Sequence, residues 1–389
     1  MKDRATPGIL PYSRQDVDES DIEAVVEVLR SDWLTTGPKV EEFERAFADR
    51  VGSGHAVAVS SGTAALHAAV FGLGIEPGDE AIVPAMTFAS TANCLVFQGA
   101  RPVFADVHPD TLLLDPADAE AKITPRTRAI IAVDYAGQPC DYDALRRISD
   151  RHGIALLADG CHSLGGQDRG RCVGTLADGT AFSFHPVKQI TTGEGGMVTT
   201  DDPDLAERMR IFRNHGITSD HRQRAREGSW FYEMTALGYN YRLTDFQCAL
   251  GLSQLRRLPE WIRRRGEIAA RYDEAFAALE VVRPLAVREG VRHAYHLYVI
   301  RLDLERLRGG RGEIFTALRA EGVGVNVHYI PVHLHPYYRS RFHTGPGMCP
   351  RAEAAYERIL SLPLFPGMSD SDVSAVIAAV EKVVRAHAA

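Results

Sequence analysis

The sequence predicts an α/β fold, with a mostly parallel central sheet covered by helices and a smaller C-terminal α+β domain. Short apolar runs alternate with helical patterns between residues 55 and 159, which is typical of a parallel sheet with crossover helices. The runs 129–133 and 154–158 contain only apolar residues. Parallel strands are covered on both faces, so unbroken apolar runs support this fold class.

The elements of the first half have local signals of their own. Residues 18–30 carry four apolar residues at helical spacing, so an amphipathic helix is expected. These residues are Ile22, Val25, Val26 and Leu29. Gly153 is placed to end a later helix in the left-handed conformation. The other expected strands are 56–59, 80–83, 102–107 and 197–200, and the other helices are 39–49, 64–73, 87–98, 114–123 and 145–152.

The second half is expected to begin with a mostly helical region, residues 200–258. It contains a helix over 244–254 and an exposed, loop-rich insert over 219–230 that is dense in Arg and His. The pattern of the sequence changes at Pro259. After it we expect helices at 261–279, 314–321 and 370–388, and strands at 294–302 and 324–329. We therefore predict a large domain over residues 1–250 and a small domain over 251–389, with the N-terminal segment packed on the small one.

Composition excludes several classes of partner. The 389 residues are 45% hydrophobic and 24% charged, and a formal net charge of -7 argues against nucleic acid or an anionic membrane. The N-terminus is polar, without the apolar core of a signal peptide, and no apolar run reaches the length of a membrane span. The six cysteines are scattered and form no C-x-x-C pair. Reduced thiols and a cytoplasmic location are therefore expected.

The stretch 181–199 carries the first chemical signal. Phe182 and Phe184 flank Ser183, and a single lysine, Lys188, precedes a Gly-rich turn at 192–196. Lysine is almost never fully buried unless it is paired or reacted, so a surface lysine in a hairpin competes with a Schiff-base lysine. Pro186 supplies a bend that can bring Ser183 and Lys188 to the same side.

Two more signals lie at predicted strand ends. Ser60–Thr63 joins a strand to a helix, and Gly62 with the hydroxyls of Ser61 and Thr63 suits a phosphate monoester at the helix N-terminus. Plain N-capping is the alternative. Asp159 ends an apolar strand, where open sheets bind ligands. Capping of a following helix is the alternative there.

Other residues have weaker signals. His162 can lie beside the same ligand as Asp159 or be structural, and Phe88 can stack on a flat ligand or belong to the core. Residues 238–242 form a polar-aromatic run or a capped turn. The histidines His328, His333 and His335 invite a metal site, but prolines lie among them and no carboxylate is near, so we predict none.

One ligand satisfies the three main signals together. It needs a phosphate for Gly62 and Thr63, an aldehyde for Lys188 and a ring cation for Asp159, and pyridoxal 5'-phosphate has all three. This cofactor withdraws electrons well only if its pyridine nitrogen stays protonated, and a buried carboxylate secures that proton.

Five motifs resemble those of the DegT/DnrJ/EryC1/StrS sugar aminotransferases, in the family's order and over nearly the whole chain. They are residues 61–66 (SGTAAL), 159–163 (DGCHS), 184–188 (FHPVK), 191–196 (TTGEGG) and 238–244 (GYNYRLT). The resemblance implies a fold-type I pyridoxal phosphate transferase. Within the family, residues 184–188, 249–255 and 327–333 look most like the pseudaminic acid branch. One departure is Asp159-Gly160-Cys161, where many relatives have Asp-Ala-Ala.

The resemblance also implies roles for single residues. Lys188 binds the cofactor covalently and moves a proton between cofactor and sugar, Asp159 holds the pyridinium, and His162 lies near the 3-hydroxyl. Gly62, Thr63 and Ser183 contact the phosphate, Phe88 stacks on the ring, and Asn240 reaches the phosphate of a neighbouring subunit, which makes a homodimer a catalytic requirement. The positions near the sugar nucleotide are Tyr12, Trp33, Leu34, Thr35, His328 and Tyr329.

The expected activity is a transaminase reaction. L-Glutamate donates an amino group, and the acceptor is a keto group, expected at C4, of a UDP-linked 6-deoxy sugar in pseudaminic acid or related amino-sugar biosynthesis. Another nucleotide-linked 3- or 4-keto sugar is the alternative. A dehydratase of the same fold carries histidine in place of Lys188, and a cofactor-binding regulator usually carries a basic DNA-binding domain, so both rivals are disfavoured. A zinc hydrolase using the C-terminal histidines is the third rival.

Overall fold

The central sheet has seven strands. The structure is a computed structural model and describes residues 8–389. The strands lie in the order β1 (His55–Val59), β9 (Gly196–Thr200), β8 (Gly179–Ser183), β5 (Ala155–Asp159), β4 (Thr127–Val133), β2 (Glu80–Pro84) and β3 (Arg101–Ala105). From β8 to β3 all neighbours are parallel, whereas β9 is antiparallel to both β8 and β1. The predicted mostly parallel sheet is confirmed, and β9 is its exception.

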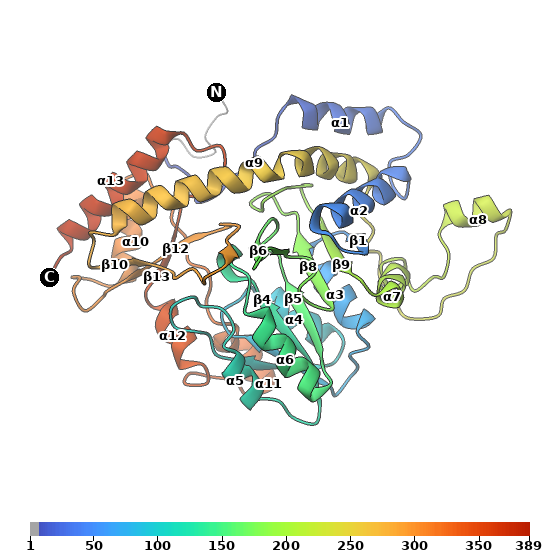
Figure 1. The fold of residues 1–389 in the computed structure, drawn as a ribbon, viewed down its shortest axis with the longest axis horizontal. Coiled ribbons are helices and arrows are strands. Elements are labelled where there is room, and N and C mark those ends of the chain that lie inside the picture. Colours follow the sequence, from blue (N-terminus) through green and yellow to red (C-terminus); the bar gives the residue numbers. More distant parts are fainter. Residues whose placement is uncertain (1–7) are drawn as a thin grey trace.

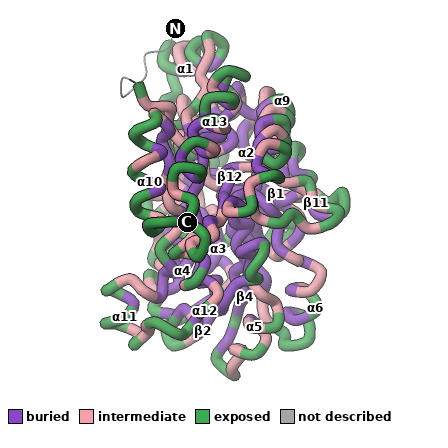
Figure 2. The backbone as a smooth tube through the Cα atoms, turned by 90° about the vertical axis from the view of Figure 1, so that its left-hand side faces the viewer, coloured by how far each residue is buried: buried purple, intermediate pink, exposed green. Residues whose placement is uncertain are grey.

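Helices cover this sheet (Figure 1). The helix α3 (Gly62–Gly72) packs on β8 and β9 and lies beside α4 (Ser90–Phe97) and α7 (Pro203–Arg213). The helix α6 (Tyr142–His152) packs on β4 and β5 beside α5 (Pro116–Ala121), and Gly153 ends it in the predicted left-handed conformation. The central strands and the inner turns of the helices are buried in Figure 2, so the sheet is the middle of the main core.

A single long helix replaces two predicted ones. The helix α9 (Asp245–Phe276) runs without a break through Pro259, so the predicted break before residue 261 is wrong. Proline inside a helix removes one hydrogen bond and its ring crowds the carbonyl four residues earlier, at a cost of about 3 kcal/mol. Here the helix packs on α1 (Glu19–Leu29) and α2 (Pro38–Val51) and buries Leu258 and Ile262 on either side of the proline. These contacts hold the helix together, and it crosses the proposed boundary at residue 250.

The C-terminal part contains a small antiparallel sheet. Its strands are β10 (Val282–Pro284), β12 (Tyr298–Leu302) and β13 (Ile359–Leu362), and α10 (Arg311–Ala320) and α13 (Asp370–Ala386) pack beside it. The predicted strand over 324–329 is wrong. Only Asn326 pairs there, in an isolated bridge with Ser361, because the segment then turns into the cavity described below. The division into domains at residue 250 stays a prediction.

Short elements link the region of the central sheet to the C-terminal part. A third sheet joins β11 (Val291–Arg292) to the hairpin of β6 (Gln167–Asp168) and β7 (Arg171–Cys172). The remaining helices are the 3₁₀ turns η1 (Tyr135–Gly137) and η2 (Val332–Leu334), and α8 (His221–Glu227), α11 (Pro336–Phe342) and α12 (Pro350–Tyr356). Near the N-terminus, Leu10 bridges Val323 and the Tyr12 carbonyl accepts from the Leu364 amide at 3.0 Å. Residues 10–12 therefore lie against the C-terminal part.

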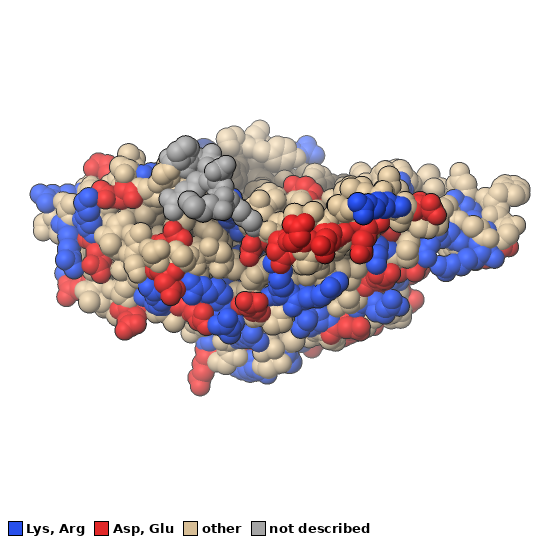
Figure 3. All heavy atoms as spheres, turned by 90° about the horizontal axis from the view of Figure 1, so that it is seen from above, with Lys and Arg blue, Asp and Glu red and all other residues tan. Residues whose placement is uncertain are grey.

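Two surface features differ from simple expectation. The insert 219–230 is exposed, as predicted, but it contains α8, which stands away from the body in Figure 1. Seen from above in Figure 3, basic side chains gather at this end, where α8 carries Arg222, Arg224 and Arg226. In α1, Ile22 and Leu29 of the predicted apolar face are exposed. Within residues 8–389 none of the helices combines the length and apolar character needed to cross a membrane.

Candidate active site

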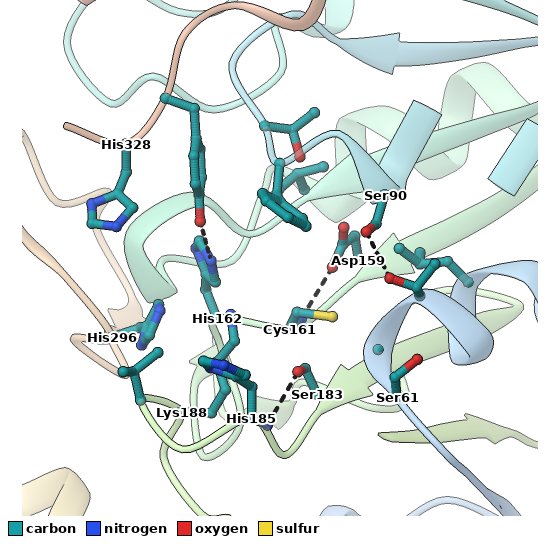
Figure 4. A pocket seen from close by; sticks show the side chains of 18 of the residues that line it. Ser61, Ser90, Asp159, Cys161, His162, Ser183, His185, Lys188, His296 and His328 are labelled. Carbon is teal, nitrogen blue, oxygen red and sulfur yellow. Dashed lines mark hydrogen bonds between the residues drawn. The ribbon is translucent and has the colours of Figure 1, made fainter. Parts of the chain in front are cut away.

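One cavity of about 530 Å³ opens where the parallel strands β4, β5 and β8 end (Figure 4). The last residue of each of these strands lines it: Val133, Asp159 and Ser183. The carboxyl ends of the strands are where open α/β sheets bind ligands. The N-terminus of α3, the segment 326–329 and Tyr12 close the other sides.

Lys188 lies at the floor of this cavity. The strand β8 ends at Ser183, and a turn at Pro186 and Val187 brings the Lys188 amide back to the His185 carbonyl at 2.9 Å. Ser183 and Lys188 therefore line the same cavity, as the predicted bend requires. Burial lowers the pKa of Lys188, against the opposing charges of Cys161 and Asp159. A lowered pKa makes the free amine, the nucleophilic form, easier to reach at neutral pH.

The N-terminus of α3 lies across the cavity from the histidines in Figure 4, in which Ser61 is labelled. The Ser61 hydroxyl caps α3 by accepting from the Ala64 amide at 3.1 Å, so the N-capping alternative is correct for this residue. Gly62 and Thr63 line the cavity as well. A Cβ on Gly62 would lie 2.8 Å from the Ser183 Cβ, so only glycine fits between the two loops.

The hydroxyls near this helix end form one cluster. Thr63 Oγ1 lies 2.7 Å from Ser90 Oγ, and both residues line the cavity with Ser183. A helix N-terminus with free amides and three hydroxyls is a site for an anion such as a phosphate monoester. Capping and anion binding are thus compatible here, since they use different groups of the same turn.

Asp159 is the last residue of β5 and is 6% exposed. Thr91 donates to its Oδ2 at 2.7 Å, and the Cys161 amide donates to its Oδ1 at 3.2 Å. Thr87 Oγ1 lies 2.7 Å from Thr91 Oγ1 and extends this network. The chain continues from Asp159 in turns to β6, so the helix-capping alternative is wrong. A buried carboxylate with two donors is prepared to pair with a cation.

His162, His296 and His328 lie together on the Lys188 side of the cavity in Figure 4, and His185 lines the cavity beside Lys188. His162 is 5% exposed, and its Nε2 lies 3.0 Å from the Tyr329 hydroxyl, while its buried Nδ1 has no hydrogen-bond partner. His328 Nδ1 lies 2.8 Å from Ser361 Oγ. Burial, helped by the charge of Lys188, lowers the pKa of His162 well below its usual range and that of His328 to about 4. These rings are therefore neutral at physiological pH.

Two more predicted residues shape the mouth. Phe88 lines the cavity and is 58% exposed, with its ring 5.9 Å from that of Tyr329, so the core alternative for Phe88 is wrong. An exposed aromatic ring beside a cavity is available to stack on a flat ligand. Tyr12 also lines the cavity, and its ring lies 5.2 Å from His328.

Some predicted residues lie elsewhere within one chain. Trp33, Leu34 and Thr35 precede α2 and are exposed outside the cavity, where Trp33 contacts His221 and Arg222 of α8. Asn240 is exposed in the segment between α8 and α9 and does not line the cavity either. Their substrate and cofactor roles stay predictions.

His328, His333 and His335, for which no metal site was predicted, do not all lie at one place. Only His328 lines the cavity, whereas His333 is buried and lies 2.9 Å from Glu353. Among residues 8–389 no group of three His, Cys, Asp or Glu side chains is arranged to hold a metal ion.

Sequence reasoning missed several lining residues. Thr87 and Ser90 flank Phe88, and His185 and Glu194 flank Lys188, so proximity to a recognised motif was their available signal. His296 gave no comparable signal, because it lies more than a hundred residues from Lys188 along the chain. Only the tertiary structure brings it to the cavity.

The residues present fit pyridoxal phosphate. An anion-binding helix end, a buried carboxylate and a lysine of lowered pKa face one cavity, and an exposed aromatic ring stands at its mouth. The unpartnered Nδ1 of His162 is a further polar atom without a partner in the protein. Buried polar groups are nearly always satisfied, so this atom points to a ligand group.

A sequence comparison matches residues 15–381 to the model of the DegT/DnrJ/EryC1/StrS aminotransferase family. The chain is 46% identical over 378 residues to the spore coat polysaccharide biosynthesis protein SpsC of Bacillus subtilis, and the match covers 97% of each chain.

Solved structures of similar proteins cover nearly the whole chain. A putative sugar aminotransferase of Streptococcus pneumoniae in its PMP form has a TM-score of 0.92 at 35% identity, covering 97% of this chain and 99% of that one. The same protein is also known in a PLP form, with a TM-score of 0.91. PseC of Helicobacter pylori, an aminotransferase involved in pseudoaminic acid biosynthesis, has a TM-score of 0.90 at 33% identity and covers 97% and 100%.

Proposed function

Since the chain belongs to the DegT/DnrJ/EryC1/StrS family and is a pyridoxal phosphate-dependent sugar aminotransferase, we propose that it moves an amino group from L-glutamate to C4 of a UDP-linked 6-deoxy-keto-hexose. The observation that carries this proposal is the meeting of Lys188, Asp159 and the N-terminus of α3 in one cavity. The similarity to PseC supports a sugar of the pseudaminic acid type.

Lys188 is the proton carrier in this proposal. When bound, pyridoxal phosphate supplies an electron sink for the bond-breaking at the amino-bearing carbon. The Nζ of Lys188 would move a proton between the cofactor and the sugar carbon, and its lowered pKa favours the basic amine that this requires. The neutral histidines nearby add no positive charge that would compete for that proton.

Asp159 and the α3 end orient the cofactor. The Asp159 carboxylate accepts from Thr91 and from the Cys161 amide, and it would hold a proton on the ring nitrogen of the cofactor by charge. Gly62, Thr63 and Ser183 would hold the phosphate, and Phe88 would stack on the ring, since all four residues line the cavity.

The sugar nucleotide occupies the histidine side of the cavity in this proposal. Tyr12, His328 and Tyr329 form that wall, because the rings of Tyr12 and Tyr329 both contact the ring of His328. The His328 carbonyl accepts from the buried Tyr135 hydroxyl, and its ring is held by Ser361, so this wall is firmly placed. A preformed wall suits binding of one defined sugar.

We also propose a homodimer with shared sites. The segment between α8 and α9 exposes large apolar side chains that a monomer leaves in water, among them Trp230 (85%), Met234 (67%) and Leu237 (76%). Asn240 follows these residues and reaches the partner's phosphate site in this arrangement. The six free cysteines fit a reducing, cytoplasmic location.

Two experiments test the proposal. The amino-loaded enzyme is mixed with a panel of keto sugar nucleotides, and the UDP-linked 4-keto-6-deoxy sugar is expected to restore the cofactor's near-visible absorbance. Recovery only with 3-keto sugars or other nucleotides refutes the substrate assignment. For the dimer, inactive K188A and weakened N240A proteins are mixed, since a hybrid dimer contains one intact site. Failure to regain activity, with hybrids present, refutes the shared site.

A further inference from the structure

His296 lines the active-site cavity and has no role in the mechanism above. It lies just before β12, is 3% exposed, and its Nδ1 has no hydrogen-bond partner. Its ring centroid is 4.3 Å from that of His162, with an interplanar angle of 46°. Figure 4 shows the two rings beside each other on the Lys188 side of the cavity. Two buried imidazoles in contact, each with an unpartnered nitrogen, need an explanation.

The main chain around His296 is held in place from three sides. The Ala294 amide donates to the Gly137 carbonyl at 2.8 Å, and the Leu297 amide donates to the Ala136 carbonyl at 3.1 Å. The buried guanidinium of Arg265 donates to the Tyr295 carbonyl at 3.1 Å. The imidazole of His296 is thus presented from a rigid segment, and a rigid segment can fix the position of what packs on it.

Gly137 sets the distance between the two histidine segments. It has a φ of +104°, and a Cβ there would lie 2.8 Å from the His162 carbonyl oxygen and 2.9 Å from the His296 amide nitrogen. Both neighbours are backbone atoms, which cannot move aside as a flexible side chain can. Glycine at this crossing therefore allows the His162 and His296 segments to approach closely.

We propose that His296 is a positioning residue: it packs against His162 while Tyr329 holds Nε2, and so fixes the ring that presents Nδ1 to the bound cofactor. Burial keeps the Tyr329 hydroxyl protonated by raising its pKa, so the hydroxyl can donate to Nε2 of His162. A neutral imidazole that accepts at Nε2 carries its proton on Nδ1. His162 then offers a donor to a ring oxygen of the cofactor. This inference rests on the proposed function.

Other titratable groups face the same ring. Lys188 and His328 act on His162 electrostatically, and both lower its pKa along with burial. Burial and the charge of Lys188 likewise lower the pKa of His296 well below its usual range, so His296 packs as a neutral ring. A neutral neighbour positions His162 without adding a charge, which is the behaviour that a positioning residue needs here.

The test is a spectroscopic pH titration of the cofactor-loaded enzyme. A donor to the ring oxygen stabilises its ionised form and lowers the midpoint at which the absorbance band changes. His296→Asn is expected to raise that midpoint by about one pH unit, a tenfold change in the ionisation constant. Tyr329→Phe is expected to raise it as well. His343→Asn is the control, because His343 is exposed and does not line the cavity.

The outcomes separate this inference from the proposed function. A wild-type protein without a titrating band contradicts the cofactor assignment itself. A wild-type band with an unchanged midpoint in folded His296→Asn, checked by circular dichroism, overturns the positioning role. A raised KM for the sugar alone, with no change in the band, also overturns it and makes His296 a substrate contact. A midpoint that rises in both His296→Asn and Tyr329→Phe but not in His343→Asn supports it.

Discussion

Acid should destabilise this protein through a buried histidine that supports the α3 end of the site. His67 lies on α3, is 1% exposed, and its ring contacts Phe212 and Tyr239. Its Nδ1 lies 3.1 Å from the Tyr241 hydroxyl. Burial lowers the pKa of His67 from 6.5 to about 4. The predicted perturbation is His67→Gln, which keeps polar atoms near Tyr241 but removes the titrating group.

The magnitude follows from proton linkage. The unfolded chain binds a proton at His67 near pH 6.5 and the folded chain only near pH 4. The stability contribution is therefore fully present above pH 6.5 and is lost as the pH falls toward 4. Between about pH 7.5 and about pH 5, this single group costs the wild type about 2 kcal/mol of unfolding free energy. Over the same pH range, the unfolding free energy of His67→Gln should fall by about 2 kcal/mol less than that of the wild type.

The assay is urea unfolding of cofactor-free protein at one protein concentration, followed by circular dichroism at both pH values. The compared quantity is the drop in unfolding free energy between them. The control is His343→Gln, because His343 is exposed and should leave the wild-type drop unchanged. If His67→Gln loses as much stability as the wild type, to within about 0.5 kcal/mol, His67 is not held neutral and the reasoning is refuted.

Four further outcomes are expected around the cavity. Lys188→Ala should lower the turnover number by at least about a thousandfold and abolish borohydride labelling of the peptide that contains residue 188, whereas retained activity would contradict the assignment. Gly62→Ala should weaken cofactor binding, measured by absorbance titration, because its Cβ would lie 2.8 Å from the Ser183 Cβ. Asp159→Asn should also weaken it, by about tenfold or more, since the carboxylate charge is lost. Thr91→Val should lower the unfolding free energy of the apo protein by about 1.5–3 kcal/mol, because its bond to Asp159 is charge-assisted, while Thr91→Ser keeps the hydroxyl and should lose less.

Local signals in the sequence predicted most of the fold correctly. The apolar runs ending at Val133 and Asp159 are strands of the central sheet, and Gly153 ends its helix as expected. Misjudged elements depended on distant contacts. Pro259 ends no helix because α1 and α2 pack on α9, and residues 324–329 form no strand because residues 326–329 turn to line the cavity.

The site divides in the same way. Lys188, Asp159 and Gly62 each follow or precede a strand with a recognisable pattern, so each could be named from its neighbours in the chain. The alternatives for these residues, a surface lysine or helix capping in place of ligand binding, could not be separated from the neighbouring sequence alone. Asp159 caps no helix, because turns follow it, and it lines the cavity. Ser61 is the cap of α3, and both Ser61 and Gly62 line the cavity.

By itself the sequence predicted most of the strand and helix pattern and the cofactor, and it indicated a chemical role for Lys188. The tertiary structure alone decided that His296 and His162 touch, that Phe88 stands exposed at the mouth, and that Asn240 lies outside the cavity of its own chain. The physical reason is how far apart along the chain the interacting residues lie. Capping, turns and periodicity depend on residues a few positions apart, whereas strand order and burial bring together residues more than a hundred positions apart.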